Sequence, residues 1–523
     1  MSADMRAGMS TGTPTAGEPA SMRTEPPREG HRASAVLALA RFETRELLQQ
    51  VPVLFFFALY VGFVVLRLMS RDGMDDFPVL NTVDRRTQVA PLLFAVALLI
   101  CTNSAALRSR KHGTVQQFDV LPMEPWRRTL AHVLSVIPYA ALTALVVAAE
   151  FTREALKPGA IGHGSLGELA VGPLSVLMAG ITGVLLARLL PSPFIPILFV
   201  IALYVLITLA SAVVGIDGKW MGWLSPILFS DSSGGDPVPA DLLGRPAGWH
   251  ALYVTAACVL LACAALLLSG GRTRAVKAAT ALALAATAAG VIGQLPRDTA
   301  ALDTARKTAS ETPQKVQSCT RYGGSTYCSF PEWKGVRPEW AEIVDRLQSL
   351  AGGSAAQAPL TVRQRIYNGE EVDAALDPSS TPGEVTVGTR WGGNRVPEFA
   401  VGAASVLVGG SENVTLQEMC DARTVTVMWL VLGADPTPMA TFQNVRLNDT
   451  TSGRDQVLAP TNGLSMTATQ TTVVRELLAG PRAEMTARVK AHWAELTSAS
   501  TTTAQAAKLL GVAVPKEAEK CEE

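Results

Sequence analysis

Long apolar runs alternate with short polar segments from about residue 51 to residue 294. Seven of these runs are long enough, or nearly so, to cross the ~30 Å hydrocarbon layer of a bilayer as helices. They lie at about residues 51–69, 89–106, 129–149, 169–189, 193–215, 250–269 and 275–294. The last run is rich in alanine and only weakly apolar. The pattern predicts a polytopic α-helical membrane protein with about seven spans in residues 51–295.

The chain beyond the last apolar run has a mixed pattern that begins with a polar linker near 296–315. Helices are expected at 338–350 and 475–510, strands at 360–367 and 384–391, and a buried helix or strand at 418–432. In the first of these helices, Trp340, Ile343, Val344 and Leu347 share one face. We therefore expect residues 296–523 to form an α+β domain.

The segment before the first span divides in two. Residues 1–34 have no apolar run and predict a disordered cytoplasmic tail, and no signal peptide is expected. Residues 35–50 predict a short interfacial helix that Ser34 caps and that lies in the headgroup plane. The charged residues of this helix are Arg41, Glu43, Arg45 and Glu46. A cytoplasmic extension of the first span would explain the same pattern.

The distribution of Lys and Arg predicts the orientation in the plasma membrane. Placing the N-terminus in the cytoplasm puts most basic residues of the short loops inside, as the positive-inside rule requires. These residues are Arg41, Arg45, Arg108, Arg110, Lys111, Arg127, Arg128, Arg188, Arg272, Arg274 and Lys277. Arg85 and Arg86 lie on the other side and weaken the bias. With seven spans, the C-terminal domain is then extracytoplasmic.

The seven cysteines fall into two groups. Three lie inside apolar spans, where cysteine acts as a small hydrophobic residue, and four lie in the C-terminal domain. An even number in an extracytoplasmic domain predicts disulfides, and Cys319 and Cys328 flank the turn signal Gly323-Gly324. The second expected pair is Cys420 with Cys521. Four buried free thiols are the alternative, while the cysteine spacing disfavours a zinc site.

Composition narrows the classes of function. Charged residues make up 17% of the chain, the formal net charge is zero and the mean hydropathy is +0.24. No basic arm or zinc-finger spacing occurs, so no nucleic-acid partner is expected. No HExxH or GxSxG motif occurs and His492 has no second histidine at metal-ligand spacing, so neither catalytic residues nor a metal site is expected.

Three other features of the C-terminal domain have a structural explanation. The acids Glu370, Glu371 and Asp373 fit a solvated turn, and Trp429 and Trp493 fit core or inter-helix packing. The domain is therefore expected to bind or sense a molecule.

Charged side chains are scarce within the predicted spans, and Arg67 and Glu150 are expected to reach water at span ends. Because charges inside a membrane mark ion and proton pathways, their scarcity argues against an ion-coupled transporter or a channel. It favours a hydrophobic or amphiphilic cargo.

The segment between the second and third spans carries a possible docking site for a cytoplasmic partner. Gly113 and Thr114 offer a turn and a helix start, Phe118 and Leu121 are apolar, and Pro122 ends the helix. The alternative is that this segment is a solvated loop with no partner.

This segment resembles the cytoplasmic loop of permease subunits of the second family of ATP-binding-cassette exporters. Three further features are similar to that family over residues 35–270. They are the interfacial helix, the loop Trp220-Met-Gly-Trp-Leu-Ser-Pro226, and Trp249-His-Ala-Leu-Tyr253 at the start of the sixth span. The seventh span and the large C-terminal domain depart from the family's six-span plan.

The resemblance implies a homodimer or heterodimer of permeases that exports an amphiphilic or peptide-like substrate across the lipid bilayer. The chain has no phosphate-binding loop, so ATP and Mg would belong to a separate ATPase subunit, and this chain itself would not be an enzyme. The alternative function is a membrane-anchored extracytoplasmic sensor, binding protein or undetected enzyme. A structural subunit of an envelope complex is a third reading.

Overall fold

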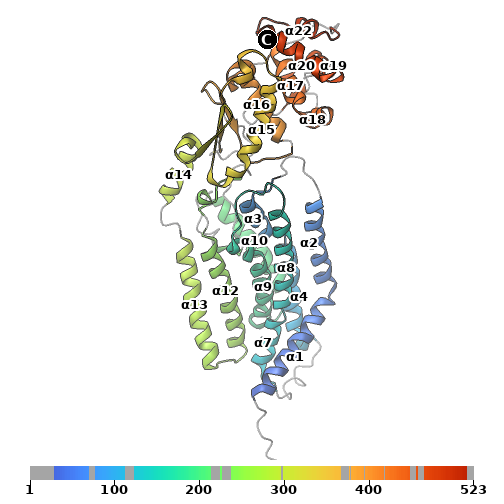
Figure 1. Cartoon of the computed structure of the whole chain (residues 1–523). Coiled ribbons are helices and arrows are strands. Elements are labelled where there is room, and N and C mark those ends of the chain that lie inside the picture. Colours follow the sequence, from blue (N-terminus) through green and yellow to red (C-terminus); the bar gives the residue numbers. More distant parts are fainter. Residues whose placement is uncertain are drawn as a thin grey trace, which may run out of the picture.

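The computed structural model describes most of the chain from residue 29 to residue 514. The described ranges are 29–69, 77–111, 123–213, 224–226, 237–244, 246–295, 299–366, 376, 378–393, 395–416, 419–447, 455–457 and 464–514. A bundle of long helices (residues 29–295) carries a smaller, sheet-containing cap domain (residues 299–514) at one end (Figure 1). Helix α1 (Glu29–Leu48) lies at the opposite end of the bundle (Figure 1).

The bundle consists of helices that run roughly side by side (Figure 1). After α1 come α2 (Val51–Met69), α3 (Leu80–Val89), α4 (Leu92–Ala106), α5 (Arg108–Lys111), α7 (Pro125–Leu134), α8 (Ile137–Ala155), α9 (Leu166–Leu189), α10 (Ile195–Val213), α12 (Ala247–Leu268) and α13 (Arg274–Gln294). A short 3-10 helix, η2 (Ala240–Leu242), precedes α12. Helix α9 is central, because it packs against α4, α8 and α12.

Six stretches of the described bundle are long and apolar enough to cross a membrane. They are Val51–Met69, Leu80–Ala106, Pro125–Ala155, Leu166–Leu189, Ala247–Leu268 and Arg274–Gln294. Each coincides with one of the expected spans, and the remaining expected span, 193–215, corresponds to α10. The chain is thus a polytopic helical membrane protein, as the sequence predicted. The second span begins nine residues earlier than expected, at Leu80 rather than residue 89, because the polar helix α3 precedes Pro91.

Helix α1 also begins earlier than expected, at Glu29, so that Ser34 lies inside the helix and is not its N-terminal cap. The helix lies along α7, where Val36 and Ala40 pack against Ala131. Residues 29–34 were expected to belong to a disordered tail, and tertiary contact with α7 gives the helix a support that local composition does not reveal.

The cap domain combines a sheet with surrounding helices. Its four-stranded sheet has the order β1 (Ser318–Tyr322), β2 (Ser325–Ser329), β3 (Thr361–Gln364) and β4 (Glu384–Val387). The β1–β2 pair is antiparallel, whereas the β2–β3 and β3–β4 pairs are parallel. A second, antiparallel sheet has the order β5 (Arg446–Leu447), β6 (Asp455–Val457) and β7 (Leu464–Met466).

The other elements of the described cap domain are helices. They are α14 (Thr299–Glu311), η3 (Pro313–Lys315), η4 (Pro331–Val336), α15 (Arg337–Leu350), η5 (Gly353–Gln357), α16 (Arg395–Gly409), η6 (Glu412–Leu416), α17 (Ala422–Gly433), α18 (Pro438–Val445), α19 (Ala468–Ala479), α20 (Arg482–Ala491), α21 (Trp493–Leu496) and α22 (Thr503–Leu510). The expected linker at 296–315 is therefore wrong for most of its length, because α14 occupies it and buries Ala309 in the core.

The core of the cap domain forms where α15 and α16 pack against the four-stranded sheet and α17 packs against these two helices. The expected face of α15 is confirmed, since Trp340, Ile343, Val344 and Leu347 are all buried. Helix α17 resolves the ambiguous run at 418–432 as a buried helix, and at twelve residues it is too short to cross a bilayer. The cap domain thus folds around an apolar core of its own helices and sheet.

Candidate functional site

The junction between the bundle and the cap domain is built by three loops of the bundle. Each loop contributes one apolar side chain to the core of the cap domain: Val79 before α3, Ile161 between α8 and α9, and Leu242 before α12. All three are buried. Because they share one core with the cap residues, moving the cap domain away would expose apolar surface on both partners. The two parts therefore behave as one packed unit.

Backbone pairing strengthens this junction. Phe77 forms an antiparallel bridge with Trp391, and its N–H donates to the Trp391 carbonyl at 3.2 Å. Next to it, Val79 pairs with Ile161 in a parallel bridge. Gly159, at a φ of +76°, leaves the space that the Phe77 ring fills. Backbone hydrogen bonds thus join the cap domain to one loop of the bundle and that loop to the next.

Two charged side chains of the cap domain bind the loop before α12. Arg306 of α14 donates from Nε to the Leu242 carbonyl at 2.9 Å. Glu332 of η4 accepts the Ala240 N–H at 2.9 Å. Burial raises the pKa of Glu332, while the Ala240 N–H and His163 oppose this rise and Asp241 adds to it. These bonds fix the loop against the cap domain on its polar side.

At the opposite end of the bundle, ion pairs between side chains hold helix α1. Glu43 of α1 is 7% exposed, and its Oε2 lies 3.5 Å from Arg108 Nη2 and 3.7 Å from His132 Nδ1. Arg108 also reaches Glu46, at 3.6 Å. Burial raises the pKa of Glu43, an effect that Arg108 opposes. Helix α1 is therefore tied to α5 and α7 at this end of the bundle.

The four charged residues expected on the interfacial helix thus take different positions. Arg41 and Arg45 are exposed, Glu46 is half-buried and Glu43 is buried. The partner that buries Glu43 could not be foreseen, because Arg108 lies on another helix.

The residues expected to contact an ATPase lie outside the described residues. They are Gly113, Thr114, Phe118, Leu121 and Pro122. The described residues nearest to this segment in the chain belong to α5 on one side and precede α7 on the other. Both helices lie at the end where α1 is bound.

The disulfide between Cys319 and Cys328 is confirmed, with a Cα–Cα distance of 4.1 Å. It joins opposite residues of the β1–β2 hairpin, and Gly323 adopts a φ of +56° in the turn. Cys420 is also disulfide-bonded. Its expected partner, Cys521, lies outside the described residues, so that pairing stays a prediction. Cys101, Cys258 and Cys263 are free and buried, as expected for small apolar residues in spans.

The buried charges of the bundle correct one expectation. Glu150 is only 2% exposed and forms an ion pair with Arg67, so it does not reach water at a span end. Asp84 of α3 and Glu168 of α9 are also buried, at 1% and 5% exposure. The sequence did not reveal the last two, because Asp84 precedes the expected start of the second span and Glu168 precedes that of the fourth.

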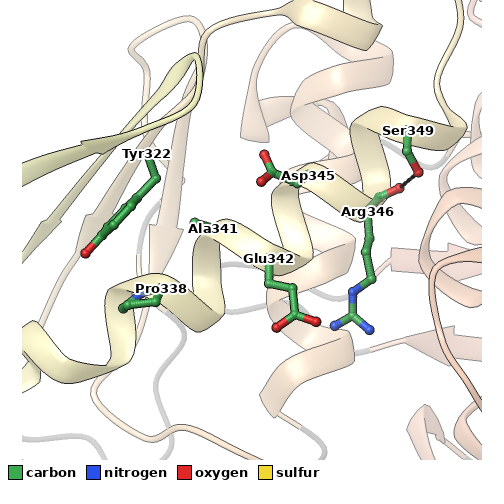
Figure 2. Close-up of a pocket in the computed structure, with 7 residues that line it drawn as sticks. All are labelled: Tyr322, Pro338, Ala341, Glu342, Asp345, Arg346 and Ser349. Atoms are coloured by element: carbon green, nitrogen blue, oxygen red, sulfur yellow. Dashed lines mark hydrogen bonds between the residues drawn. The ribbon is translucent and has the colours of Figure 1, made fainter.

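The cap domain has a shallow pocket between the β1–β2 hairpin and α15. Figure 2 shows the Tyr322 side chain on the hairpin side and the acids Glu342 and Asp345 on the helix side. Its full lining is Tyr322, Pro338, Ala341, Glu342, Asp345, Arg346 and Ser349. Among the described residues, no group of three or more His, Cys, Asp and Glu side chains is arranged to hold a metal ion.

The remaining residues that the sequence singled out either pack in the cap domain or lie outside the described residues. Trp429 is buried in the cap core and Trp493 packs against it, as expected. His492 lies 3.9 Å from Glu495 on the neighbouring turn. The acids Glu370, Glu371 and Asp373 are outside the described residues.

No family model, curated protein or solved structure matches this chain.

Proposed function

We propose that the chain is the permease subunit of an ATP-binding-cassette exporter for an amphiphilic or peptide-like molecule. In this proposal, the end of the bundle that holds α1 faces the cytoplasm and the cap domain faces the outside. A separate ATPase subunit binds ATP and Mg²⁺ and supplies the energy. The exposed apolar faces of α2 and α10 meet lipid or a second permease subunit.

The observation that carries this proposal is the platform in which ion pairs join α1 to α5 and apolar packing joins α1 to α7. A cytoplasmic motor can move a bundle only through a contact that transmits force, and a loosely attached helix would not transmit it. Arg108 of α5 forms ion pairs with Glu43 and Glu46 of α1. Val36 and Ala40 of α1 pack against Ala131 of α7. The segment that resembles an ATPase-docking loop, residues 108–129, includes α5 and the first part of α7.

The junction at the other end also supports a working bundle. In a protein whose spans only anchor an outer domain, one flexible connection would be sufficient. Here three separate loops enter the core of the cap domain, so a change in the spacing of α3, α9 and α12 would reach the cap domain directly.

The pocket at Tyr322 favours a second candidate function, a membrane-anchored binding protein. Two exposed carboxylates, a half-buried arginine and an aromatic ring could recognise a small polar ligand. This function would need no ATPase and no platform for one to bind. The two candidates therefore differ in a partner that can be purified.

The deciding experiment is purification of the full-length protein from its own membranes into lipid nanodiscs. We expect a subunit with a phosphate-binding loop to co-purify in stoichiometric amounts and to hydrolyse ATP. Phe118→Asp and Leu121→Asp should weaken that association about thirtyfold or more, because each places a charge in a desolvated contact. ATP-dependent transport in reconstituted vesicles should fall with it.

The matched control is Val514→Asp, which places the same charge on an exposed apolar position of the cap domain. It should leave both the ATPase and transport unchanged. Purification of wild-type protein without an ATPase, in a state that binds ligand through the cap domain, would favour the anchor instead.

A further inference from the structure

Asp84 and Glu168 belong to a ladder of polar contacts between α3 and α9. Asp84 and Gln88 lie four residues apart on α3 and share one face of that helix, while Ser165 is the N-cap of α9 and Glu168 lies in its first turn. The Ser165 N–H donates to Asp84 Oδ2 at 2.8 Å, and the Gln88 side-chain amide donates to Glu168 Oε2. The ladder thus buries two carboxyl groups, one from each helix, in the same contact between α3 and α9.

Among the described residues, no cation forms an ion pair with the carboxyl of Asp84. It is 1% exposed, and Oδ1 is buried with no hydrogen-bond partner in the described part of the chain. Of the charged groups on the helices around it, Glu168 and Arg85 act on Asp84, and the described part of α8 adds none. Arg85 directs Nε to the Asn81 carbonyl at 2.8 Å, one turn back along α3.

Two negative charges in such a site would repel each other across a medium of low dielectric, with little solvation of either. One proton removes that repulsion. Protonation at Asp84 Oδ1 leaves the Ser165 bond to Oδ2 intact, and a proton needs no cavity. From this geometry we infer that Asp84 and Glu168 form a proton-binding site, which holds one proton at neutral pH.

The site lies directly below the junction with the cap domain. Asn81, one turn before Asp84, donates to the Val238 carbonyl at 3.0 Å, and Val79 is part of the cap core. On the other side of the ladder, Ser165 follows Ile161, which enters the same core. Loss of the proton therefore places a second charge between the two segments that hold the cap domain, and the site links proton binding to this joint.

Infrared difference spectroscopy of the full-length protein in lipid vesicles tests the inference. The wild type should show the C=O stretching band of a protonated carboxylic acid at neutral pH, and this band should disappear as the pH is raised. Asp84→Asn should remove the contribution of the ladder to this band at neutral pH, because it removes the buried carboxyl that carries the proton. Glu168→Gln should weaken it or move its loss to lower pH, and serves as the second variant if Asp84→Asn fails to fold.

The control is Asp303→Asn, at an exposed carboxyl on α14, which should leave the band unchanged. A wild-type spectrum without a protonated carboxyl at neutral pH would overturn the inference. So would a band that titrates identically in the wild type and in both ladder variants. Neither result depends on whether the chain has an ATPase partner.

Discussion

The bundle and the cap domain are both rich in buried apolar residues, but they pack in different ways. The cap domain buries four tryptophans, Trp333, Trp340, Trp391 and Trp429, and the ring of Trp391 meets those of Trp340 and Phe399 edge-on. In the bundle, α9 approaches α4 closely at a glycine. An added Cβ at Gly183 of α9 would collide with the Leu99 carbonyl and the Thr102 hydroxyl of α4.

The difference follows from the solvent. Water drives the cap domain to bury large apolar surfaces, whereas lipid is as apolar as the side chains and gives no such drive. Helices in lipid associate through close fit and through hydrogen bonds to carbonyls that small residues expose. Thr102 and Asn103 of α4 make such bonds, donating to the carbonyls of Gly180 and Gly183 at 3.0 and 3.2 Å.

The largest expected effect is on the aromatic core. Trp340→Ala should destabilise the cap domain by about 3–5 kcal/mol, because it removes a fully buried ring and leaves a cavity. Urea unfolding followed by limited proteolysis of the cap domain would measure the loss. Trp493→Ala, at a half-buried tryptophan, should cost clearly less. Equal losses in the two variants would mean that aromatic burial is not what holds this domain.

The hairpin disulfide should have the next largest effect. Replacing Cys319 and Cys328 together by Ala should lower the free energy of unfolding of the cap domain by roughly 2–3 kcal/mol, because the bond closes a short loop in the unfolded chain. Non-reduced peptide mapping would first verify the bond in purified protein. Unchanged unfolding in the double variant would show that the strand pairing alone closes the hairpin.

A glycine substitution tests the bundle side of the comparison. Gly183→Leu should destabilise the bundle by about 1–3 kcal/mol, because the side chain must push α9 away from α4. Thermal inactivation in lipid bicelles would report it. Gly62→Leu in α2 is the matched control, since an added Cβ there meets nothing within 4 Å. A bundle that tolerates both changes equally would not depend on close helix contact.

The smallest expected effect is on the pH dependence of the cap domain. Glu412 accepts from the Ser379 N–H and the Thr386 hydroxyl, each at 2.8 Å, yet burial outweighs these bonds and raises its pKa. The folded domain then binds this proton more tightly than the unfolded chain. Its contribution to stability is complete below the ordinary glutamate pKa and is lost as the pH rises through the raised value.

Unfolding of the cap domain measured across that pH window would show the predicted decline. Glu412→Gln should flatten this part of the profile, while Glu342→Gln, at an exposed glutamate, should not. If the Glu412→Gln variant keeps the wild-type slope, the pH dependence belongs to other groups.

The parts of the fold that the sequence could predict are those set by local pattern. Apolar runs identified the spans, one-face periodicity identified α15, and a Gly-Gly turn between two cysteines identified the β1–β2 hairpin. Each signal lies within a window of about twenty residues or fewer, because spans, amphipathic helices and tight turns have that size.

The junction and the proton ladder could not be predicted, because each joins distant segments. Val79, Ile161 and Leu242 are single apolar residues in loops, with no period to mark them as core. Asp84 and Glu168 become neighbours only when α3 packs against α9. The linker that proved to be α14 has a polar composition, and its helix is supported by contacts with the loop before α12.

The shared core also fixes an order of assembly during biosynthesis. Val79, Ile161 and Leu242 precede the cap residues in the chain, and the cap core is incomplete without them. The cap domain can therefore reach its final packing only after the helices that carry these three loops have been inserted and brought together. An error in insertion would leave Trp391 without Phe77, its partner in the isolated β-bridge. Correct folding of the cap domain therefore reports that the bundle was assembled correctly.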